Sequence, residues 1–259
     1  MRLLPAFAVG VLVASSVSAA VTTSEVEYRH GDTVLQGFMA WDDSVQGRRP
    51  GVLIVHQWMG LTDYERMRAE QLASLGYVAL AVDVYGKGVR PADTGEAGKL
   101  AGTYKKDRAL LRARVAAGLE ALRASERVDP KRIAAIGYCF GGTAVLELAR
   151  SGADVAGVVA FHGGLDSPSP ADGRNVKARV LVLHGADDPY VPEADIAAFQ
   201  KELRDAKVDW QMVYYSGAVH AFTQKGAGND PSRGAAYDER ADRRSWQAMR
   251  AFFEEIFAR

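Results

Sequence analysis

Runs of consecutive apolar residues, separated by polar segments with helical periodicity, are the main pattern along this chain. An unbroken apolar run of this length is typical of a strand that is covered on both faces of a sheet. Five such runs occur, at residues 51–55, 77–82, 133–136, 155–161 and 180–183, and a further strand is predicted at 211–215. The pattern therefore predicts a largely buried sheet.

Helical patterns lie between these strands. Residues 62–65 (Thr-Asp-Tyr-Glu) form a capping box, which predicts a helix that runs to about Leu75 and stops at Gly76. Further helices are predicted at 95–124, 140–150, 193–205 and 237–257. Because strands alternate with helices, we expect βαβ units, with a mostly parallel sheet and helices on both faces. Residues 26–28 and 33–41 flank a His-Gly-Asp turn, which predicts an antiparallel hairpin at the sheet edge.

No repeat or low-complexity linker divides residues 21–259, so a single α/β domain is predicted.

The 259 residues are 48% hydrophobic and 25% charged, which is typical of a globular chain that buries a full core without disulfides or metals. Lys and Arg number 32, as do Asp and Glu. This balance leaves no excess positive charge for a dedicated nucleic-acid binder and favours a small-molecule substrate. The sequence does not fix the oligomeric state, and a monomer is favoured.

Residues 1–20 have the pattern of a signal peptide. Arg2 supplies a positive start, residues 3–13 are mostly apolar, and residues 15–20 offer small-residue cleavage pairs. The apolar run is short for a bilayer span. We expect export to the periplasm or the medium, with no stable membrane insertion after cleavage. The alternatives are an uncleaved N-terminal anchor and a chain that is not exported.

The chain has one cysteine, Cys139, which excludes an intramolecular disulfide and a multi-cysteine zinc site. It lies in the sequence Gly-Tyr-Cys-Phe-Gly-Gly, after a predicted strand and before a predicted helix. This is the pattern of a nucleophile elbow, with cysteine in place of the commoner serine. Such a turn leaves room only for glycine two residues before and after the nucleophile, hence Gly137 and Gly141. The helix N-terminus favours the thiolate. The alternative is a buried cysteine that packs as a small apolar side chain.

Two further residues complete a predicted triad. Asp188 follows the strand at 180–183, and His220 follows the strand at 211–215. The order nucleophile, acid, histidine is the one expected for this architecture, and all three residues follow the carboxyl ends of strands. Alternatively, Asp188 caps the next helix and His220 is a surface residue.

The remaining histidines have other expected roles. His162 is a candidate for the mouth of a substrate pocket, whereas His56 and His184 are expected to pack or to brace loops. No histidines have metal-ligand spacing, and no Walker or dinucleotide glycine motif follows a strand. No metal and no cofactor are therefore predicted.

These motifs resemble the dienelactone hydrolase family, which has the α/β-hydrolase fold, over residues 25–257. The resemblance rests on the elbow, on Asp-x-x-x-Pro at 188–192 (with Val191), on Gly-x-x-His-x-Phe at 217–222, and on Asp-Val-Tyr-Gly at 83–86. It implies hydrolysis of a strained or activated ester, such as an enol-lactone opened to a dicarboxylic keto acid. It also implies that the backbone N–H groups of Phe140 and Trp58 bind the oxyanion.

The chain departs from the family at the pocket. Gln57 occupies the position of a family glutamate that can influence the protonation of the cysteine. Because an amide cannot take up a proton, activation would rest on His220 and the helix dipole. Lys87 and Arg90 are loose counterparts of the cationic residues that hold the substrate carboxylate in the family.

We therefore expect a hydrolase that cleaves an activated ester or lactone through Cys139, His220 and Asp188, with an acyl-thioester intermediate. One alternative is a general carboxylesterase, acetyl esterase or peptidase on the same fold. Another is a catalytically silent binding protein. Residues 223–235, which follow His220 directly, form either a mobile cover or a long surface connection.

Overall fold

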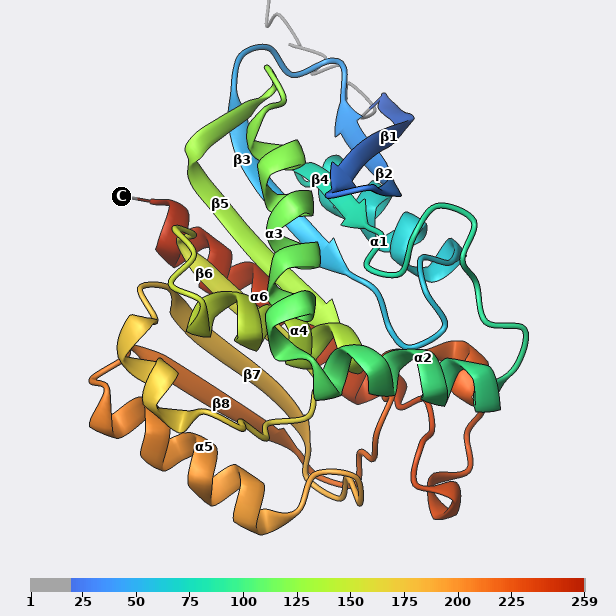
Figure 1. Ribbon diagram of the computed structural model, residues 1–259, viewed down its shortest axis with the longest axis vertical. Helices are drawn as coiled ribbons and strands as arrows, with labels where there is room; N and C mark the ends of the chain where they lie inside the picture. Colours follow the sequence, from blue (N-terminus) through green and yellow to red (C-terminus); the bar gives the residue numbers. More distant parts are fainter. Residues whose placement is uncertain (1–19, 259) are drawn as a thin grey trace, which may run out of the picture.

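An eight-stranded sheet lies at the centre of the molecule, with helices on both of its faces (Figure 1). The computed structural model describes residues 20–258, so the expected signal peptide lies outside the described residues except for Ala20. The strand order is β1-β2-β4-β3-β5-β6-β7-β8. β2 pairs antiparallel with β1 and β4, and the pairs from β4 to β8 are parallel. The single α/β domain with a mostly parallel sheet is confirmed.

The strands are β1 (Val21–His30), β2 (Thr33–Asp42), β3 (Arg49–Val55), β4 (Val78–Val82), β5 (Val128–Tyr138), β6 (Gly157–Phe161), β7 (Arg179–Gly185) and β8 (Trp210–Tyr215). The α-helices are α1 (Asp63–Ser74), α2 (Thr94–Lys106), α3 (Arg108–Arg123), α4 (Phe140–Arg150), α5 (Glu193–Asp205) and α6 (Glu239–Phe257). Three short 3₁₀ turns are η1 (Pro170–Asn175), η2 (Lys225–Ala227) and η3 (Pro231–Arg233).

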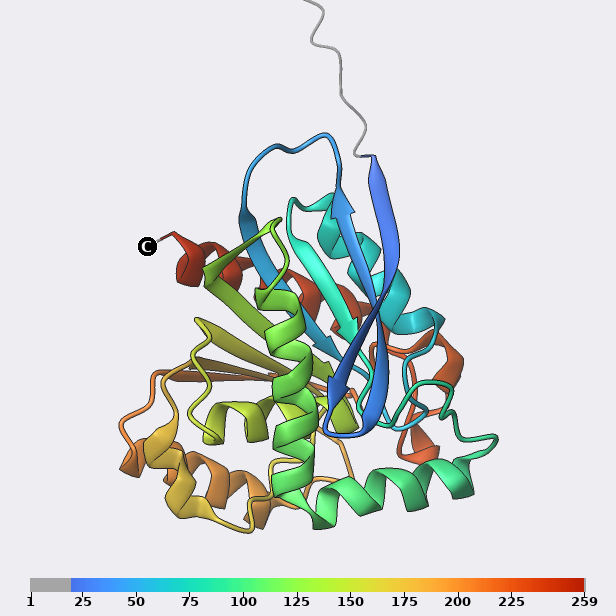
Figure 2. The same ribbon diagram turned by 45° about the horizontal axis from the view of Figure 1, so that its top comes forward.

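The predicted helix at 95–124 is wrong as a single element. Asp107 ends α2 with φ −107° and ψ 83°, and its side chain accepts a hydrogen bond of 2.9 Å from the backbone N–H of Leu110. The same residue therefore caps the start of α3. The two helices meet at a bend (Figure 2), so that α3 packs against the sheet while α2 extends past its carboxyl edge.

The sheet is covered on one face by α1 and α6 and on the other by α3, α4 and α5 (Figures 1 and 2). Side chains of the central strands alternate between two apolar clusters: Leu53 belongs to the α3 and α4 side, whereas Val52 and Ile54 belong to the α1 and α6 side. All three are fully buried. Burying a side chain of this size contributes roughly 1.5–3 kcal/mol, which explains why these strands read as unbroken apolar runs.

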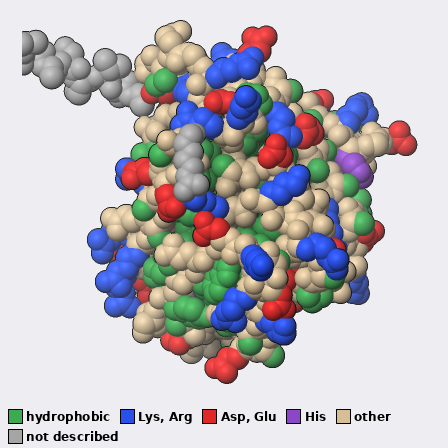
Figure 3. Space-filling view, turned by 90° about the vertical axis from the view of Figure 1, so that its left-hand side faces the viewer, with side chains coloured by type: hydrophobic (Ala, Val, Ile, Leu, Met, Phe, Trp, Pro, Cys, Tyr) green, Lys and Arg blue, Asp and Glu red, His purple; other side chains and the backbone are tan. Residues whose placement is uncertain are grey.

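Charges of both signs are interspersed over much of the face of the molecule seen in Figure 3, and an apolar area lies among them in the lower middle of the view. This surface agrees with the equal numbers of acidic and basic residues. Among residues 20–258, no helix combines the length and the apolar character that a membrane span requires.

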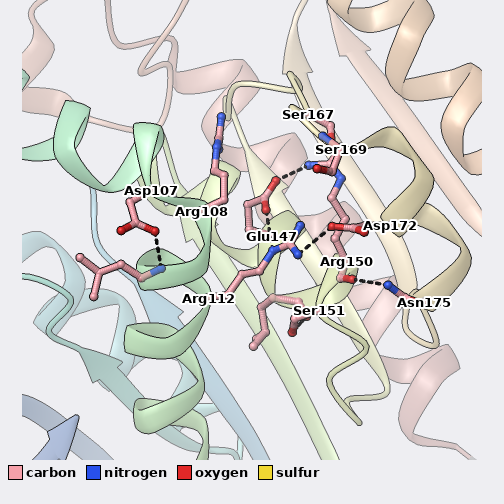
Figure 4. A network of polar contacts seen from close by, with 12 residues as sticks. Asp107, Arg108, Arg112, Glu147, Arg150, Ser151, Ser167, Ser169, Asp172 and Asn175 are labelled. Carbon is pink, nitrogen blue, oxygen red and sulfur yellow. Dashed lines mark hydrogen bonds and ion pairs between the residues drawn. The ribbon is translucent and has the colours of Figure 1, made fainter. Parts of the chain in front are cut away.

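A buried ion network fastens α4 to its neighbours (Figure 4). The guanidinium of Arg150, 1% exposed, makes two bonds of 2.8 Å to Glu202 of α5 and one of 3.0 Å to Glu147. Arg112 of α3 bonds the other oxygen of Glu147 and also Asp172, both at 2.8 Å. Because each carboxylate of this network meets a cation, the charges are tolerated in the interior.

We predict that Arg150→Met lowers the free energy of unfolding by about 3–5 kcal/mol, because it leaves the buried Glu202 carboxylate without a cation and Glu147 with Arg112 alone. Urea-induced unfolding followed by circular dichroism measures the change. The control is Lys201→Met, which removes an exposed ion pair with Asp205 and is expected to cost less than about 1 kcal/mol. Equal losses for the two variants would contradict the prediction.

Candidate active site

The sharp turn between β5 and α4 places Cys139 in a strained backbone conformation, with φ 55° and ψ −114°. The chain crosses itself closely here. A Cβ atom on Gly137 would lie 2.0 Å from the carbonyl oxygen of Gly141, and one on Gly141 would lie 2.1 Å from that of Val55. No side chain fits at either position, which is the reason for glycine in the predicted elbow.

The structure brings Cys139, His220 and Asp188 together from the segments after β5, β8 and β7. The Nε2 atom of His220 lies 3.1 Å from the Sγ atom of Cys139, and its Nδ1 atom lies 2.8 Å from Oδ2 of Asp188. The other carboxylate oxygen of Asp188 accepts the backbone N–H of Tyr190 at 2.9 Å. The carboxylate therefore fixes the ring, and the ring faces the sulfur.

The protonation of the pair follows from this contact. Burial raises the pKa of the Cys139 thiol, but the charge and hydrogen bond of His220, the ammonium of Lys105 and the backbone N–H of Phe140 lower it further, so the net pKa lies below its ordinary value. Burial lowers the pKa of His220, yet the cysteine and Asp188 together raise it to about 10. The two shifts favour a thiolate beside an imidazolium.

The segment after His220 turns back and holds the histidine. The His220 backbone N–H donates to the carbonyl oxygen of Gly234 at 3.2 Å, and the N–H of Ala236 donates to the carbonyl oxygen of His220 at 3.0 Å. The Tyr190 ring lies perpendicular to the His220 ring, with centroids 5.4 Å apart. The segment after His220 thus holds this histidine in place, in addition to connecting β8 with α6.

Two backbone N–H groups are candidates for an oxyanion site. The Phe140 N–H interacts with the Cys139 sulfur, whose pKa it lowers, and no oxygen or nitrogen atom within residues 20–258 accepts a hydrogen bond from the Phe140 or the Trp58 N–H. The carbonyl oxygen of Gln57 accepts from Nδ1 of His56 at 2.5 Å and from the N–H of Gly60 at 3.2 Å. Since a peptide unit is planar and trans, these bonds turn the N–H of Trp58 the opposite way.

His56 is a fully buried brace for this peptide, as the sequence suggested. Its Nε2 atom accepts the backbone N–H of Val84 at 3.1 Å, so the proton lies on Nδ1, which donates to Gln57. Burial lowers the pKa of His56 to about 4 and keeps the ring neutral. In addition, the hydroxyl of Tyr85 donates to the carbonyl oxygen of Trp58 at 2.9 Å.

His162 lies beneath the nucleophile rather than at the mouth of a pocket, because its side chain is fully buried. Its Nδ1 atom accepts the backbone N–H of Cys139 at 3.2 Å, and its Nε2 atom donates to the hydroxyl of Thr223 at 2.8 Å. Burial holds the pKa of His162 well below its ordinary value. The neutral ring is thus a second brace for the nucleophile turn.

The two expected pocket cations have other partners. Lys87 forms an exposed ion pair with Glu27 of β1. Arg90 donates to the carbonyl oxygen of Leu61 at 3.0 Å and lies 3.6 Å from the carboxylate of Asp83, so it braces the loop after β3. Neither contact turns these charges toward Cys139.

Lys105 is a residue that the sequence reasoning missed. It lies in the last turn of α2. Its ammonium is 3.9 Å from where a Cβ atom on Gly164 would lie. The carbonyl oxygen of Gly164 accepts the hydroxyl of Thr143 in the first turn of α4, so the ammonium lies near the start of that helix. Within residues 20–258 it has no ion-pair partner. Nothing in the sequence could have singled it out, because only the bend at Asp107 aims α2 across the site.

We predict that Lys105→Gln slows alkylation of Cys139 by iodoacetamide about two- to fivefold at a pH below the titration midpoint of the thiol. Loss of the cation raises the pKa of the thiol, and the effect of one partly screened charge at this range is modest. Lys106→Gln, the matched control on the same turn, leaves the rate unchanged. If the two variants behave alike, or if added salt does not reduce the effect, the assignment of Lys105 is wrong.

Within the described part of the chain, no three His, Cys, Asp or Glu side chains converge as metal ligands. Several known proteins are similar to this chain. A protein of Bradyrhizobium sp, named as a probable 2-oxo-3-(5-oxofuran-2-ylidene)propanoate lactonase, is 30% identical over 69% of this chain and 75% of its own length.

Two solved structures are more similar. One, named m3DLH, is 43% identical and has a TM-score of 0.88, and the match covers 92% of this chain and 99% of that one. The other, a dienelactone hydrolase-like promiscuous phosphotriesterase, P91, from metagenomic libraries, is 42% identical with a TM-score of 0.87 and the same coverage. The sequence model of the dienelactone hydrolase family matches residues 35–257. This chain therefore belongs to the dienelactone hydrolase family and is a carboxylic ester hydrolase.

Proposed function

We propose that this hydrolase cleaves an activated ester or lactone with Cys139 as nucleophile, His220 as acid and base, and Asp188 as the group that orients the histidine. The observation that carries the proposal is the His220 ring, which lies 3.1 Å from the sulfur through one nitrogen and 2.8 Å from the carboxylate through the other. A ring held in this way can pass a proton between sulfur, leaving group and water.

In the first half of the reaction the Cys139 thiolate attacks the carbonyl carbon of the substrate. The carbonyl oxygen becomes an oxyanion and accepts hydrogen bonds from the N–H groups of Phe140 and Trp58. The tetrahedral adduct then collapses: the bond from carbon to the alcohol oxygen breaks, and Nε2 of His220 gives its proton to that oxygen. For an ester the products of this half are the free alcohol and an acyl-thioester, whereas for a lactone the new hydroxyl stays attached to the acyl group of the thioester.

In the second half a water molecule attacks the thioester carbon and gives a proton to the now neutral His220. The same two N–H groups hold the second oxyanion. When this adduct collapses, the bond between carbon and sulfur breaks, and the acid leaves. The sulfur regains its thiolate form beside the protonated ring, so the starting state is restored.

The nature of the nucleophile limits the substrates. A thiolate stabilised by His220 and by its environment is also a good leaving group, so the first adduct tends to return to substrate unless the alcohol departs easily. Activated esters and lactones meet this condition, whereas amides do not. We therefore expect amide cleavage to be negligible, which separates this proposal from a peptidase on the same fold.

We predict that Cys139→Ala lowers kcat/KM for p-nitrophenyl acetate at least 10³-fold, since it removes the nucleophile. Release of p-nitrophenolate, followed by its absorbance, gives the rate. Iodoacetamide is expected to label the wild-type thiol stoichiometrically near pH 6 (about two units below a free thiol's pKa). Turnover that survives in Cys139→Ala would overturn the triad. A thiol that reacts no faster than free cysteine would favour a silent binding protein instead.

Phosphotriester hydrolysis is a second candidate activity, favoured by the 42% identity with the promiscuous phosphotriesterase. The Cys139 thiolate would attack phosphorus and expel an aryl alcohol that takes the proton of His220. We predict that paraoxon releases p-nitrophenol in the wild type but not in Cys139→Ala. If paraoxon is inert, or if both proteins release p-nitrophenol equally, this candidate fails while the ester proposal stands.

A further inference from the structure

A cavity of about 430 Å³ lies between α1, the segment after His220 and the start of α6. Figures 1 and 2 show these three segments beside one another, on the face of the sheet that α1 and α6 cover. The lining includes Gln57, the residue before Trp58, and Thr223, which follows His220 by three positions. The cavity is therefore formed in part by residues next in sequence to the candidate oxyanion N–H and close in sequence to the histidine.

Hydrogen bonds join the wall of the cavity to the nucleophile turn. The Thr223 hydroxyl, which accepts from His162 beneath Cys139, also accepts the hydroxyl of Tyr64 at 2.7 Å. Tyr64 in turn accepts from Nε of Arg68 at 3.1 Å. The cavity and the nucleophile thus share one continuous set of bonds.

The charged residues of the cavity wall are one ion pair and one exposed lysine. Arg68 forms an ion pair of 2.5 Å with Asp242, and their side chains are only 7% and 17% exposed. The remaining cation of the lining, Lys225, is exposed at the rim, with its ammonium 6.0 Å from the centre of the Tyr237 ring. An anionic ligand would meet the Asp242 carboxylate and would find the Arg68 guanidinium already paired.

Amide groups in the lining have hydrogen-bonding capacity to spare. The Nε2 atom of Gln224 is buried and has no partner among the described residues. The side-chain amide of Gln57 makes no hydrogen bond within residues 20–258, and Gln71 uses only its oxygen, which accepts from Arg68 at 3.1 Å. Because a desolvated amide without a partner is costly, a purely apolar ligand would be disfavoured here.

We propose that this cavity binds an uncharged, hydroxyl-rich part of the substrate, such as the ring of a sugar lactone. Hydroxyl groups both donate and accept, which matches the three amides and the ion pair, and the lining residues Tyr64 and Tyr237 add aromatic surface for the apolar part of a sugar ring. The volume lies within the range of small-molecule pockets. The inference rests on the proposed ester and lactone hydrolysis for the reaction, but the binding itself does not require it.

The test compares two six-membered lactones, glucono-δ-lactone and δ-valerolactone, which differ in the hydroxyl-bearing substituents. The quantity compared is kcat/KM for glucono-δ-lactone divided by kcat/KM for δ-valerolactone. We expect Met67→Trp, which fills the cavity from α1, to lower this ratio at least tenfold, and Gln224→Leu to lower it about fivefold. Leu75→Trp is the matched control: Leu75 is 38% exposed, Met67 is 37% exposed, and Leu75 does not line the cavity. The thermal midpoint of each variant shows that it is folded.

Binding is measured separately, without turnover. Saturation-transfer NMR is expected to show methyl glucoside bound to the wild type and to Leu75→Trp but not to Met67→Trp. The proposal is overturned if the three proteins bind methyl glucoside alike, if Met67→Trp and Leu75→Trp change the lactone ratio equally, or if glucuronate binds as well as the neutral sugar. Loss of all lactone and aryl-ester turnover in the wild type, with methyl glucoside still bound, would refute the reaction and leave the cavity assignment intact.

Discussion

The contact between backbones at the nucleophile turn is the constraint on which the rest of the site depends. The turn brings Gly141 against the carbonyl group of Val55, at the end of the neighbouring strand, at a distance that excludes any side chain. This contact fixes how α4 leaves the sheet, and thereby where the Phe140 N–H and the cysteine sulfur lie. It also sets the loop after β3, because Val55 leads directly into the peptide that carries the Trp58 N–H. Strain in one residue is thus held by the packing of two strands and a helix.

The proposed mechanism relies on main-chain N–H groups, and buried side chains orient the peptides that carry them. His56 fixes the carbonyl group of Gln57 and so aims the next N–H, while His162 holds the N–H of Cys139 from below. Both rings work in the neutral form, with one nitrogen accepting and the other donating. Burial imposes that form. Such braces act through geometry that is set before the substrate arrives.

The sequence allowed the sheet, the hairpin and the three residues of the candidate triad to be predicted, because each leaves a local signature. Buried strands are apolar without interruption, the elbow requires Gly137 and Gly141, and Asp188 and His220 directly follow strands. The bend at Asp107 was missed, since an aspartate within a polar helical pattern is also an ordinary surface residue. The position of Lys105 depends on that bend, and the ion-pair partners of Lys87 and Arg90 depend on the path of the loop after β4. Both are decided by tertiary structure and not by local sequence. The cavity between α1 and α6 joins residues that are up to 185 positions apart, from Gln57 to Asp242, and no local pattern records it.

The two buried histidines, His56 and His162, also make the stability of the folded protein depend on pH. In an unfolded chain their pKa values would lie near 6.5, whereas in the folded protein the pKa of His56 is about 4 and that of His162 is well below its ordinary value. As the pH falls from about 6.5 toward 4, these histidines become protonated in the unfolded chain but stay neutral in the folded protein. The stability that the folded protein has at neutral pH is therefore progressively lost over this range. Mild acid therefore weakens the fold through the two histidines that support the candidate oxyanion peptide and the nucleophile turn.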